Sequence, residues 1–303
     1  VKKDMIKNFL KYKIEYTDYM KSDFINLTDE EKKNHLTSKN YITILNYLNK
    51  KEYVNTMRDK ILFNKIFKNY IKRDWIDLRT SSLKEFKEFI KDKDIIFGKI
   101  QNGFGSHGIR KIIVKDIDNV EKLYKSLKDN KQILVEEGII QHPTLNKFNP
   151  YAVDTLRIIT LLDKEGKPHI IGNAFRININ DDEAISCFDA FMKIDENGNL
   201  ISNCVDDNEI IYKEHPNIKI KFNTLKVPFA KEAFKMVKEA AKVVPEIRYV
   251  GWDVAITKDG PQLLEGNEYP SYGLVQYYLI TKKRGHLEDI KDVLKDEFDN
   301  IKL

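Results

Sequence analysis

Cysteine is scarce in this sequence, and glycine and proline are missing from residues 1–92. The two cysteines, Cys187 and Cys204, have neither a CxxC partner nor the spacing of metal ligands. This pattern indicates no disulfide scaffold, and reduced thiols in the cytoplasm are the expectation. Glycine and proline interrupt helices, so their absence agrees with helices on short connections in residues 1–92.

Long apolar runs and dense basic blocks are also missing. No segment approaches the roughly twenty apolar residues that a membrane-spanning helix needs, so no span is expected. The first residues, VKKDMIKNFLKYKIEY, are charged throughout and do not resemble a secretion signal. The net charge of +5 is spread over alternating basic and acidic residues. It indicates no nucleic-acid partner and hints only weakly at anionic ligands such as nucleotides.

Side chains for covalent catalysis are not recognisable either. No serine or cysteine stands in a nucleophile motif. The histidines at 107, 142, 169 and 215 show no metal-ligand spacing. The sequence therefore offers no protein nucleophile and no histidine-based metal site.

The length of 303 residues exceeds the size at which one core usually keeps growing, so two or three subdomains are expected. Apolar residues at i, i+3, i+4 and i+7 predict helices over residues 1–92, one of them capped by Thr28. Residues 93–140 mix short apolar runs with one helix, and residues 141–303 are dominated by strands. The predicted fold class is α+β: a helical N-terminal section, a small α+β unit and a larger antiparallel α+β unit.

The stretch GWDVAITKDGPQLLEGN places two carboxylates and an amide on two apolar runs joined by a Lys-Asp-Gly turn. Alternation puts Asp253 among large apolar residues of a central strand, where a carboxylate is costly unless paired or metal-bound. Glu265 and Asn267 share one face of the second strand. This all-oxygen set suits Mg²⁺, and the alternative is a hairpin whose polar side chains face solvent.

A second stretch, IIFGKIQNGFGSHGI, carries Lys99 and then Gly103, Gly105 and Gly108 in a short loop. Glycines let backbone N–H groups approach phosphate oxygens, and a lysine at the mouth adds positive charge. The pattern matches neither the P-loop nor the dinucleotide fingerprint, since a strand follows the loop. A phosphate-binding loop and an ordinary hairpin turn are both compatible with it.

Two further features are a pair of glutamates at a strand end and two arginines inside strands. Glu136 and Glu137 end the run QILVEE, either beside an adenine ring or as a charged strand end before a loop. Arg157 and Arg176 are two of only eight arginines and lie in DTLRIITLL and NAFRINI. An arginine in an apolar strand usually meets a carboxylate or a phosphate.

The order of these features resembles that of the ATP-grasp enzymes. A lysine with a glycine loop, a glutamate pair, strand arginines and the Asp-turn-Glu-x-Asn hairpin follow one another between about Asp59 and Gln276. Within this region VEEGIIQHP, DTLRIIT, KEHPN and GWDVAITKDGPQLLEGNEYPS resemble the sugar-transfer-associated ATP-grasp branch, found in bacterial surface-polysaccharide clusters. The resemblance implies an ATP-grasp fold, in which two α+β subdomains grip ATP.

The resemblance also implies a role for each candidate residue. One or two Mg²⁺ ions would be held by Asp253, Glu265 and Asn267. The other ATP contacts would be two phosphate lysines, four lid residues over the phosphates and three residues lining the adenine slot: Lys60 and Lys99; Gly103, Gly105, Ser106 and Gly108; Glu136, Glu137 and Ile139. Lys99, Arg157 and Arg176 would offset the charge that develops on the γ-phosphoryl group.

Two positions depart from the family pattern. Many ATP-grasp ligases carry an arginine two residues before the metal aspartate, and this chain has Gly251 there. Arg157 or Arg176 would have to substitute, or the acceptor chemistry differs. The ribose-binding carboxylate is also missing, and Gln141 or His142 would take its place.

The chemistry implied by the family is activation of a carboxylate by ATP to an acyl phosphate, which an amine then attacks. The first hypothesis is a carboxylate–amine ligase acting on a sugar acid or an amino acid, with His215 as a candidate base. The second is a phosphotransferase on the same scaffold, and the third is a nucleotide-binding accessory protein without turnover. Acceptor specificity is expected in residues 64–80 and 180–225, and a homodimer is possible by analogy.

Overall fold

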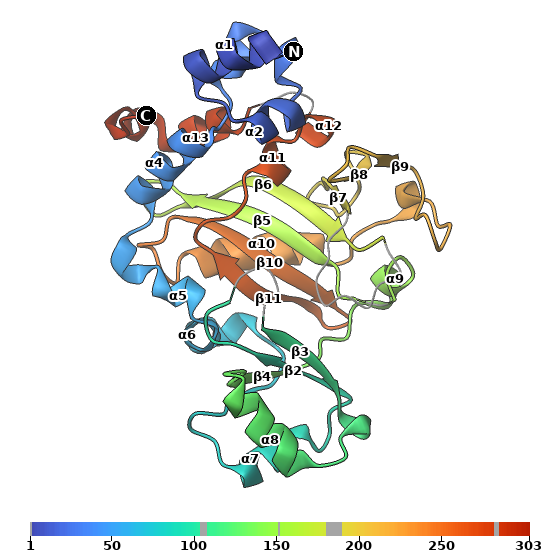
Figure 1. The fold of residues 1–303 in the computed structure, drawn as a ribbon. Helices are drawn as coiled ribbons and strands as arrows, with labels where there is room; N and C mark the ends of the chain where they lie inside the picture. Colours follow the sequence, from blue (N-terminus) through green and yellow to red (C-terminus); the bar gives the residue numbers. More distant parts are fainter. Residues whose placement is uncertain (1, 104–107, 151, 180–189, 282–284) are drawn as a thin grey trace.

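The computed structural model describes residues 2–103, 108–150, 152–179, 190–281 and 285–303. Two antiparallel sheets and the helices around them form these ranges (Figure 1). The small sheet has the strand order β1-β4-β2-β3, and the large sheet has the order β11-β10-β5-β6-β7-β8-β9. The predicted α+β class is confirmed.

Helices dominate the N-terminal section, as the apolar periodicity predicts. They descend along one side of the molecule toward the small sheet (Figure 1). Thr28 and Glu31 form the expected capping box, in which each side chain accepts from the other residue's backbone N–H. The helices are α1 (Lys2–Tyr12), α2 (Tyr16–Lys21), α3 (Asp29–Lys33), α4 (Ser38–Leu48), α5 (Asn55–Arg58) and α6 (Lys60–Ile66).

One strand interrupts the section predicted to be wholly helical. β1 (Trp75–Asp77) pairs antiparallel with β4 (Leu134–Glu137) and so joins the small sheet. Three residues are too short a run for an alternating pattern to reveal. Together with α7 (Leu83–Ile90), β1 lies on the N-terminal side of the predicted boundary at residue 93, and we propose that the small unit begins near residue 74.

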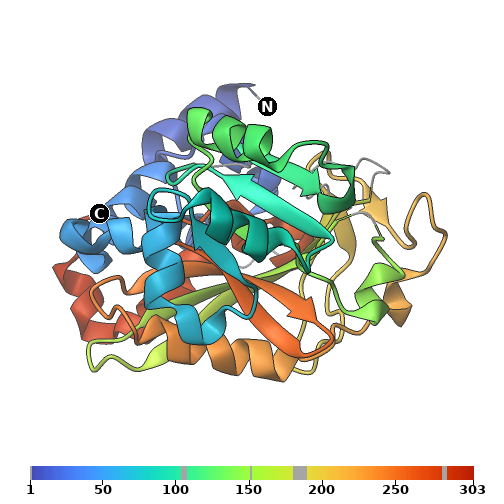
Figure 2. The same cartoon turned by 90° about the horizontal axis from the view of Figure 1, so that it is seen from below.

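The small unit packs its two helices on one face of its sheet. Phe86 of α7 and Leu127 of the second helix share a core with Ile96 of the sheet. The other face, which carries Lys99 and Glu136, is turned toward the large sheet. Figure 2 views the molecule from this end. The remaining elements are β2 (Ile95–Lys99), β3 (Ile109–Ile113) and α8 (Val120–Asp129).

The large sheet contains the strands predicted from residues 141–303. α10 (Ala230–Ala241) covers one of its faces, through a core that includes Leu156, Trp252 and Val254. The strands are β5 (Thr155–Leu162), β6 (Pro168–Ile177), β7 (Ala190–Met192), β8 (Cys204–Asp206), β9 (Ile211–Tyr212), β10 (Tyr249–Thr257) and β11 (Gly260–Asn267). The remaining helices are α9 (Pro143–Asn146), α11 (Gly273–Gln276), α12 (Tyr278–Thr281) and α13 (His286–Leu294).

On the opposite face of the large sheet, the strands carry apolar side chains at one end and charged side chains at the other. At one end Ile159, Leu161 and Tyr249 pack beneath α4 and α13. At the other end the same strand faces carry Arg157 and Asp253, because side chains two residues apart share a face. This charged half therefore lies toward the small unit. None of the helices in the described ranges has the length and apolarity needed to cross a membrane.

Candidate nucleotide and metal site

Arg157 and Asp253 face each other as cross-strand partners on β5 and β10. Arg157 Nε and Nη2 donate to the two carboxylate oxygens of Asp253 at 2.5 and 2.8 Å. Arg176 Nη2 on β6 lies 3.7 Å from Asp253 Oδ2. Burial alone would raise the pKa of Asp253, but the two guanidinium groups lower it to about 2. The buried carboxylate is therefore ionised at neutral pH.

Glu265 and Asn267 complete the predicted oxygen set from the neighbouring strand. β11 places Glu265 opposite Asp253 and Asn267 opposite Gly251, with a bulge after Asp253. Asn267 Nδ2 donates to Glu265 Oε1 at 3.3 Å, and the Glu265 side chain is 41% exposed. The hairpin is thus not a solvent-facing turn alone, since its three polar side chains converge on the charged half of the sheet.

Metal binding by this set rests on two carboxylates and one amide. In the described ranges no group of three His, Cys, Asp or Glu side chains is placed to hold a metal ion. An amide oxygen is, however, an ordinary ligand for hard cations, and Mg²⁺ is often held by only one or two carboxylates together with phosphate oxygens. The donor chemistry of Asp253, Glu265 and Asn267 therefore fits Mg²⁺.

Lys60 connects this carboxylate set to the glycine loop. Its Nζ lies 3.6 Å from Glu265 Oε2 and donates to the Gly103 carbonyl oxygen at 2.9 Å. The lysine is fixed by the start of α6, where Asp59 caps the helix and accepts from Gln101 Nε2 at 2.5 Å. The predicted phosphate lysine thus lies between the hairpin of the large sheet and the loop of the small sheet.

The partly exposed Lys99 forms an ion pair with the buried Glu136 on the small sheet. Glu136 also accepts from Arg73 Nη2 at 2.8 Å and from Asn64 Nδ2 at 2.7 Å. Burial would raise the pKa of Glu136, but Arg73 and Lys99 hold it well below its usual range. The carboxylate of Glu136 therefore positions Lys99, while its predicted place beside adenine stays a prediction.

Arg73 is a site residue that sequence reasoning missed. Besides Glu136, it contacts β11 of the large sheet: Nη1 donates to Leu263 O at 2.6 Å and Nη2 to Leu264 O at 3.2 Å. It therefore joins the two sheets behind Lys99. The signal available in the sequence was the rarity of arginine in this lysine-rich chain. Arg73 thus serves as a joint, and the expectation that residues 64–80 carry acceptor specificity stays a prediction.

The glycine loop is described at its two ends. Gly108 has a positive φ of 76°, and a Cβ there would lie 2.8 Å from Ile100 side-chain atoms, so only glycine fits without strain. Gly103 accepts from Lys60, as described above. Gly105 and Ser106, predicted to cover the phosphates, lie outside the described residues.

The segment after Glu136 contains the other predicted nucleotide contacts. Glu137 makes two hydrogen bonds with Asp74. Its backbone N–H donates to Asp74 O at 2.9 Å, and its Oε2 accepts from Asp74 N at 3.1 Å. Ile139 is half-buried. Gln141 is buried, and its Oε1 accepts from Asp154 N at 2.6 Å. Gln141 is therefore held by its own loop, which makes it the poorer of the two ribose candidates.

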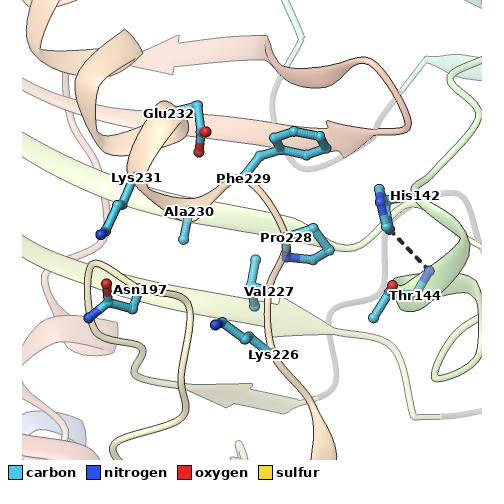
Figure 3. Close-up of a pocket in the computed structure, with 10 residues that line it drawn as sticks. All are labelled: His142, Thr144, Asn197, Lys226, Val227, Pro228, Phe229, Ala230, Lys231 and Glu232. Atoms are coloured by element: carbon cyan, nitrogen blue, oxygen red, sulfur yellow. Dashed lines mark hydrogen bonds between the residues drawn. The ribbon is translucent and has the colours of Figure 1, made fainter.

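His142 lines a cavity of about 480 Å³ beside the start of α10 (Figure 3). Its Nδ1 accepts from Thr144 N at 3.1 Å, and its ring packs edge-on against Phe229. The other walls come from Asn197 and residues 226–232. Since α10 covers the face of the large sheet opposite Asp253, the predicted contact of His142 with ribose stays a prediction.

His215 is not available as a base. It is buried, its Nδ1 accepts from Asn217 N and Ile218 N at 3.3 Å, and its Nε2 lies 3.4 Å from Asn178 O. The ring therefore organises its own turn. The suggestion that it deprotonates an amine substrate is wrong for this arrangement.

Gly251 is required by close packing. A Cβ at this position would lie 2.4 Å from Pro270 Cβ and 3.4 Å from Arg157 Cδ. We expect Gly251→Ala to lower the free energy of unfolding by about 1–3 kcal/mol, because the added methyl group must displace the chain around Pro270. Urea denaturation measures the change. Gly273→Ala is the matched control, with a nearest contact of 3.5 Å, and equal stability of both variants would contradict the packing.

Together, the two sheets and the charged side chains between them define an enzyme of the ATP-grasp class. The model of the sugar-transfer associated ATP-grasp family matches residues 95–292. The chain therefore belongs to this family, which confirms the resemblance seen in the sequence. A search of curated proteins finds no match.

Solved structures share the fold at low sequence identity. The biotin carboxylase domain of Hydrogenobacter thermophilus 2-oxoglutarate carboxylase has a TM-score of 0.51 at 14% identity, over 79% of this chain and 46% of that one. Campylobacter jejuni biotin carboxylase has a TM-score of 0.50 at 13% identity, over 78% of this chain and 46% of that one. D-alanyl-alanine synthetase A of Vibrio cholerae has a TM-score of 0.47 at 14% identity, over 78% of this chain and 64% of that one. The chain thus spans about half to two thirds of the length of these proteins.

Proposed function

We propose that this chain is an ATP- and Mg²⁺-dependent, ADP-forming carboxylate–amine ligase that modifies a sugar acid or an amino acid in surface-polysaccharide biosynthesis. The observation that carries the proposal is the position of Lys60, between Glu265 and the Gly103 carbonyl. A lysine shared by a carboxylate hairpin and a glycine loop suits a triphosphate bound between them. The family's description supports the link to sugar transfer.

Asp253, Glu265 and Asn267 are the residues that would hold Mg²⁺. The ion would supply Lewis-acid neutralisation of phosphate oxygens. The paired Arg157 keeps Asp253 ionised in its buried setting, and Glu265 is accessible beside it. Lys60 and Lys99 would bind phosphate oxygens from the loop side. The described residues thus offer positive charge on both sides of the proposed triphosphate.

The proposed reaction has two steps. A carboxylate oxygen of the substrate attacks the γ-phosphorus, the bond to the β–γ bridging oxygen breaks, and ADP leaves. The amine nitrogen then attacks the acyl carbon, the bond to the phosphate oxygen breaks, and the amine loses a proton as inorganic phosphate departs. Lys99, Arg157 and Arg176 would offset negative charge during both transfers, and binding of both substrates supplies the proximity.

Arg157 is the better candidate to replace the arginine that many related ligases carry at the position of Gly251. A side chain at 251 would start 3.4 Å from Arg157 Cδ, so Arg157 already occupies the neighbouring space. Its guanidinium reaches Asp253 from the adjacent strand. In this proposal the positive charge near Asp253 comes from Arg157 on β5 instead of from an arginine at position 251 on β10.

A phosphotransferase that stops after the first transfer is the second candidate, and Gly251 favours it. Without an arginine at that position, a tetrahedral intermediate has less charge stabilisation unless Arg157 serves. An accessory protein without turnover is less compatible with Lys60, Lys99, Glu265 and Asp253 all being present. The cytoplasmic location and the homodimer stay predictions.

An assay with substrate pools tests the proposal. The protein is incubated with ATP, Mg²⁺ and pools of amino acids and sugar acids, while ADP, inorganic phosphate and product mass are followed. We expect acceptor-dependent ADP and phosphate together with a condensation product, all lost when EDTA removes the metal and restored by Mg²⁺. ADP with a phosphorylated product would favour the phosphotransferase, and no acceptor-dependent ADP from broad pools would contradict both.

A further inference from the structure

Helix α1 carries large apolar side chains on both its inner and its outer side. On its inner side Met5 and Tyr12 pack against the apolar core around Phe24, and the buried Asn8 donates from its Nδ2 to Asp4 Oδ2 at 2.8 Å. Tyr19 OH of α2 donates to the same Asp4 oxygen at 2.5 Å. This packing and these hydrogen bonds fix which side of α1 faces outward.

Three large apolar side chains lie on the outward side of α1. Ile6, Phe9 and Leu10 lie three and four residues apart, so they form one stripe on the helix. Their exposed fractions are 61%, 51% and 64%. On α2 the apolar side chains of Tyr16 and Met20, four residues apart, are exposed as well. Three neighbouring large apolar side chains turned to solvent indicate a contact surface.

Lysines surround this stripe, which we call the outer stripe of α1 (Ile6, Phe9 and Leu10). Five lysines lie in residues 2–13, of which Lys11 pairs with Asp29 of α3 at 2.7 Å. The single acid in this range, Asp4, is already bonded to Asn8 and Tyr19. Lys3 and Lys7 are exposed and form no ion pair with any residue of the described ranges. An apolar stripe with a basic rim matches the surface of an anionic bilayer, where acyl chains lie beneath negative headgroups.

We propose that the outer stripe of α1 docks on an anionic phospholipid membrane surface. A second copy of this chain fits the surface less well, because face-to-face contact would bring the two lysine rims together. Three side chains are also few for the roughly 800 Å² per partner of a stable protein interface. α1 lies at the end of the molecule opposite the small unit, so docking leaves the space between the two sheets accessible (Figure 1). The proposal goes beyond the ligase function and does not depend on it.

Sedimentation with lipid vesicles tests the proposal on the full chain. We expect binding to vesicles of phosphatidylcholine mixed with phosphatidylglycerol and much weaker binding to phosphatidylcholine alone. The double variant Phe9→Ser, Leu10→Ser should lower the partition coefficient roughly tenfold or more, because two anchoring side chains are removed. Lys3→Gln with Lys7→Gln should lower it roughly five- to thirtyfold, and added salt should weaken wild-type binding.

Ile201→Ser is the matched control, since Ile201 is 48% exposed and distant in sequence from α1. Circular dichroism checks that each variant folds. In a second measurement, the fluorescence of Leu10→Trp should shift to shorter wavelength with anionic vesicles only. Absence of binding, equal binding to neutral vesicles, or equal loss in the control would overturn the proposal. A concentration-dependent dimer that Phe9→Ser disrupts, without vesicle binding, would assign the stripe to a second copy instead.

Discussion

Glu265→Gln should abolish ATP turnover while leaving the fold intact. The substitution keeps the size of the side chain and its contact with Asn267, but it removes the negative charge that faces Lys60 and the proposed Mg²⁺. A metal held by fewer carboxylates binds the triphosphate poorly and neutralises it poorly. We expect acceptor-dependent ADP formation to fall by roughly a thousandfold, the upper end of the loss seen when one preorganised electrostatic group is removed.

The measurement is ADP release at saturating ATP over a range of Mg²⁺ concentrations, with circular dichroism to confirm folding. Glu196→Gln, an exposed glutamate in a loop of the large unit, is the matched control and should keep wild-type activity. Unchanged turnover in Glu265→Gln would sink the assignment of the hairpin as the metal site. Loss in both variants would assign the effect to charge in general.

Glu136→Gln should lower the free energy of unfolding by about 3–5 kcal/mol. The carboxylate is 2% exposed and neutralises Arg73 and Lys99, of which Arg73 is 3% exposed. An amide of the same size leaves these cations close together without a counter-charge, and the loss of one partner from a buried ion pair has this magnitude. Because Arg73 also donates to β11, the joint between the two sheets should loosen with it.

Urea denaturation followed by circular dichroism measures this loss. Glu137→Gln is the neighbouring control: its carboxylate is partly exposed and accepts one bond from Asp74 N, so we expect a change of less than about 1 kcal/mol. If Glu136→Gln were as stable as this control, the cations would have other partners, and the ion pairs would not hold Lys99 in place.

Much of the fold followed from local pattern. The hairpin around Lys258 was predictable because two apolar runs flank a Lys-Asp-Gly turn, and pairing then brings Asp253 and Glu265 together. The capping box at Thr28 was predictable for the same reason, since its signal is contained within four residues. The ATP-grasp resemblance rested on the order of the motifs along the chain, because no single motif was specific enough to indicate the family.

What the sequence could not reveal depends on contacts between distant segments. The partner of Arg157 was open between a carboxylate and a phosphate, and only strand pairing shows that it is Asp253, 96 residues away. Arg73 donates to Leu263 across 190 residues, and β1 is too short for a periodic signal. The predicted base His215 failed because ring hydrogen bonds to nearby backbone cannot be read from residue identity.

Transfer of ¹⁸O from substrate to phosphate tests the central claim most directly. The carboxylate found in the pool assay is labelled with ¹⁸O and incubated with the protein, ATP, Mg²⁺ and the amine, and the released phosphate is analysed by mass spectrometry. The proposed acyl phosphate passes one carboxylate oxygen to phosphorus, so one labelled oxygen should appear in each inorganic phosphate. Unlabelled phosphate, or ADP formed with a stable phosphorylated product and no free phosphate, would contradict the ligase mechanism.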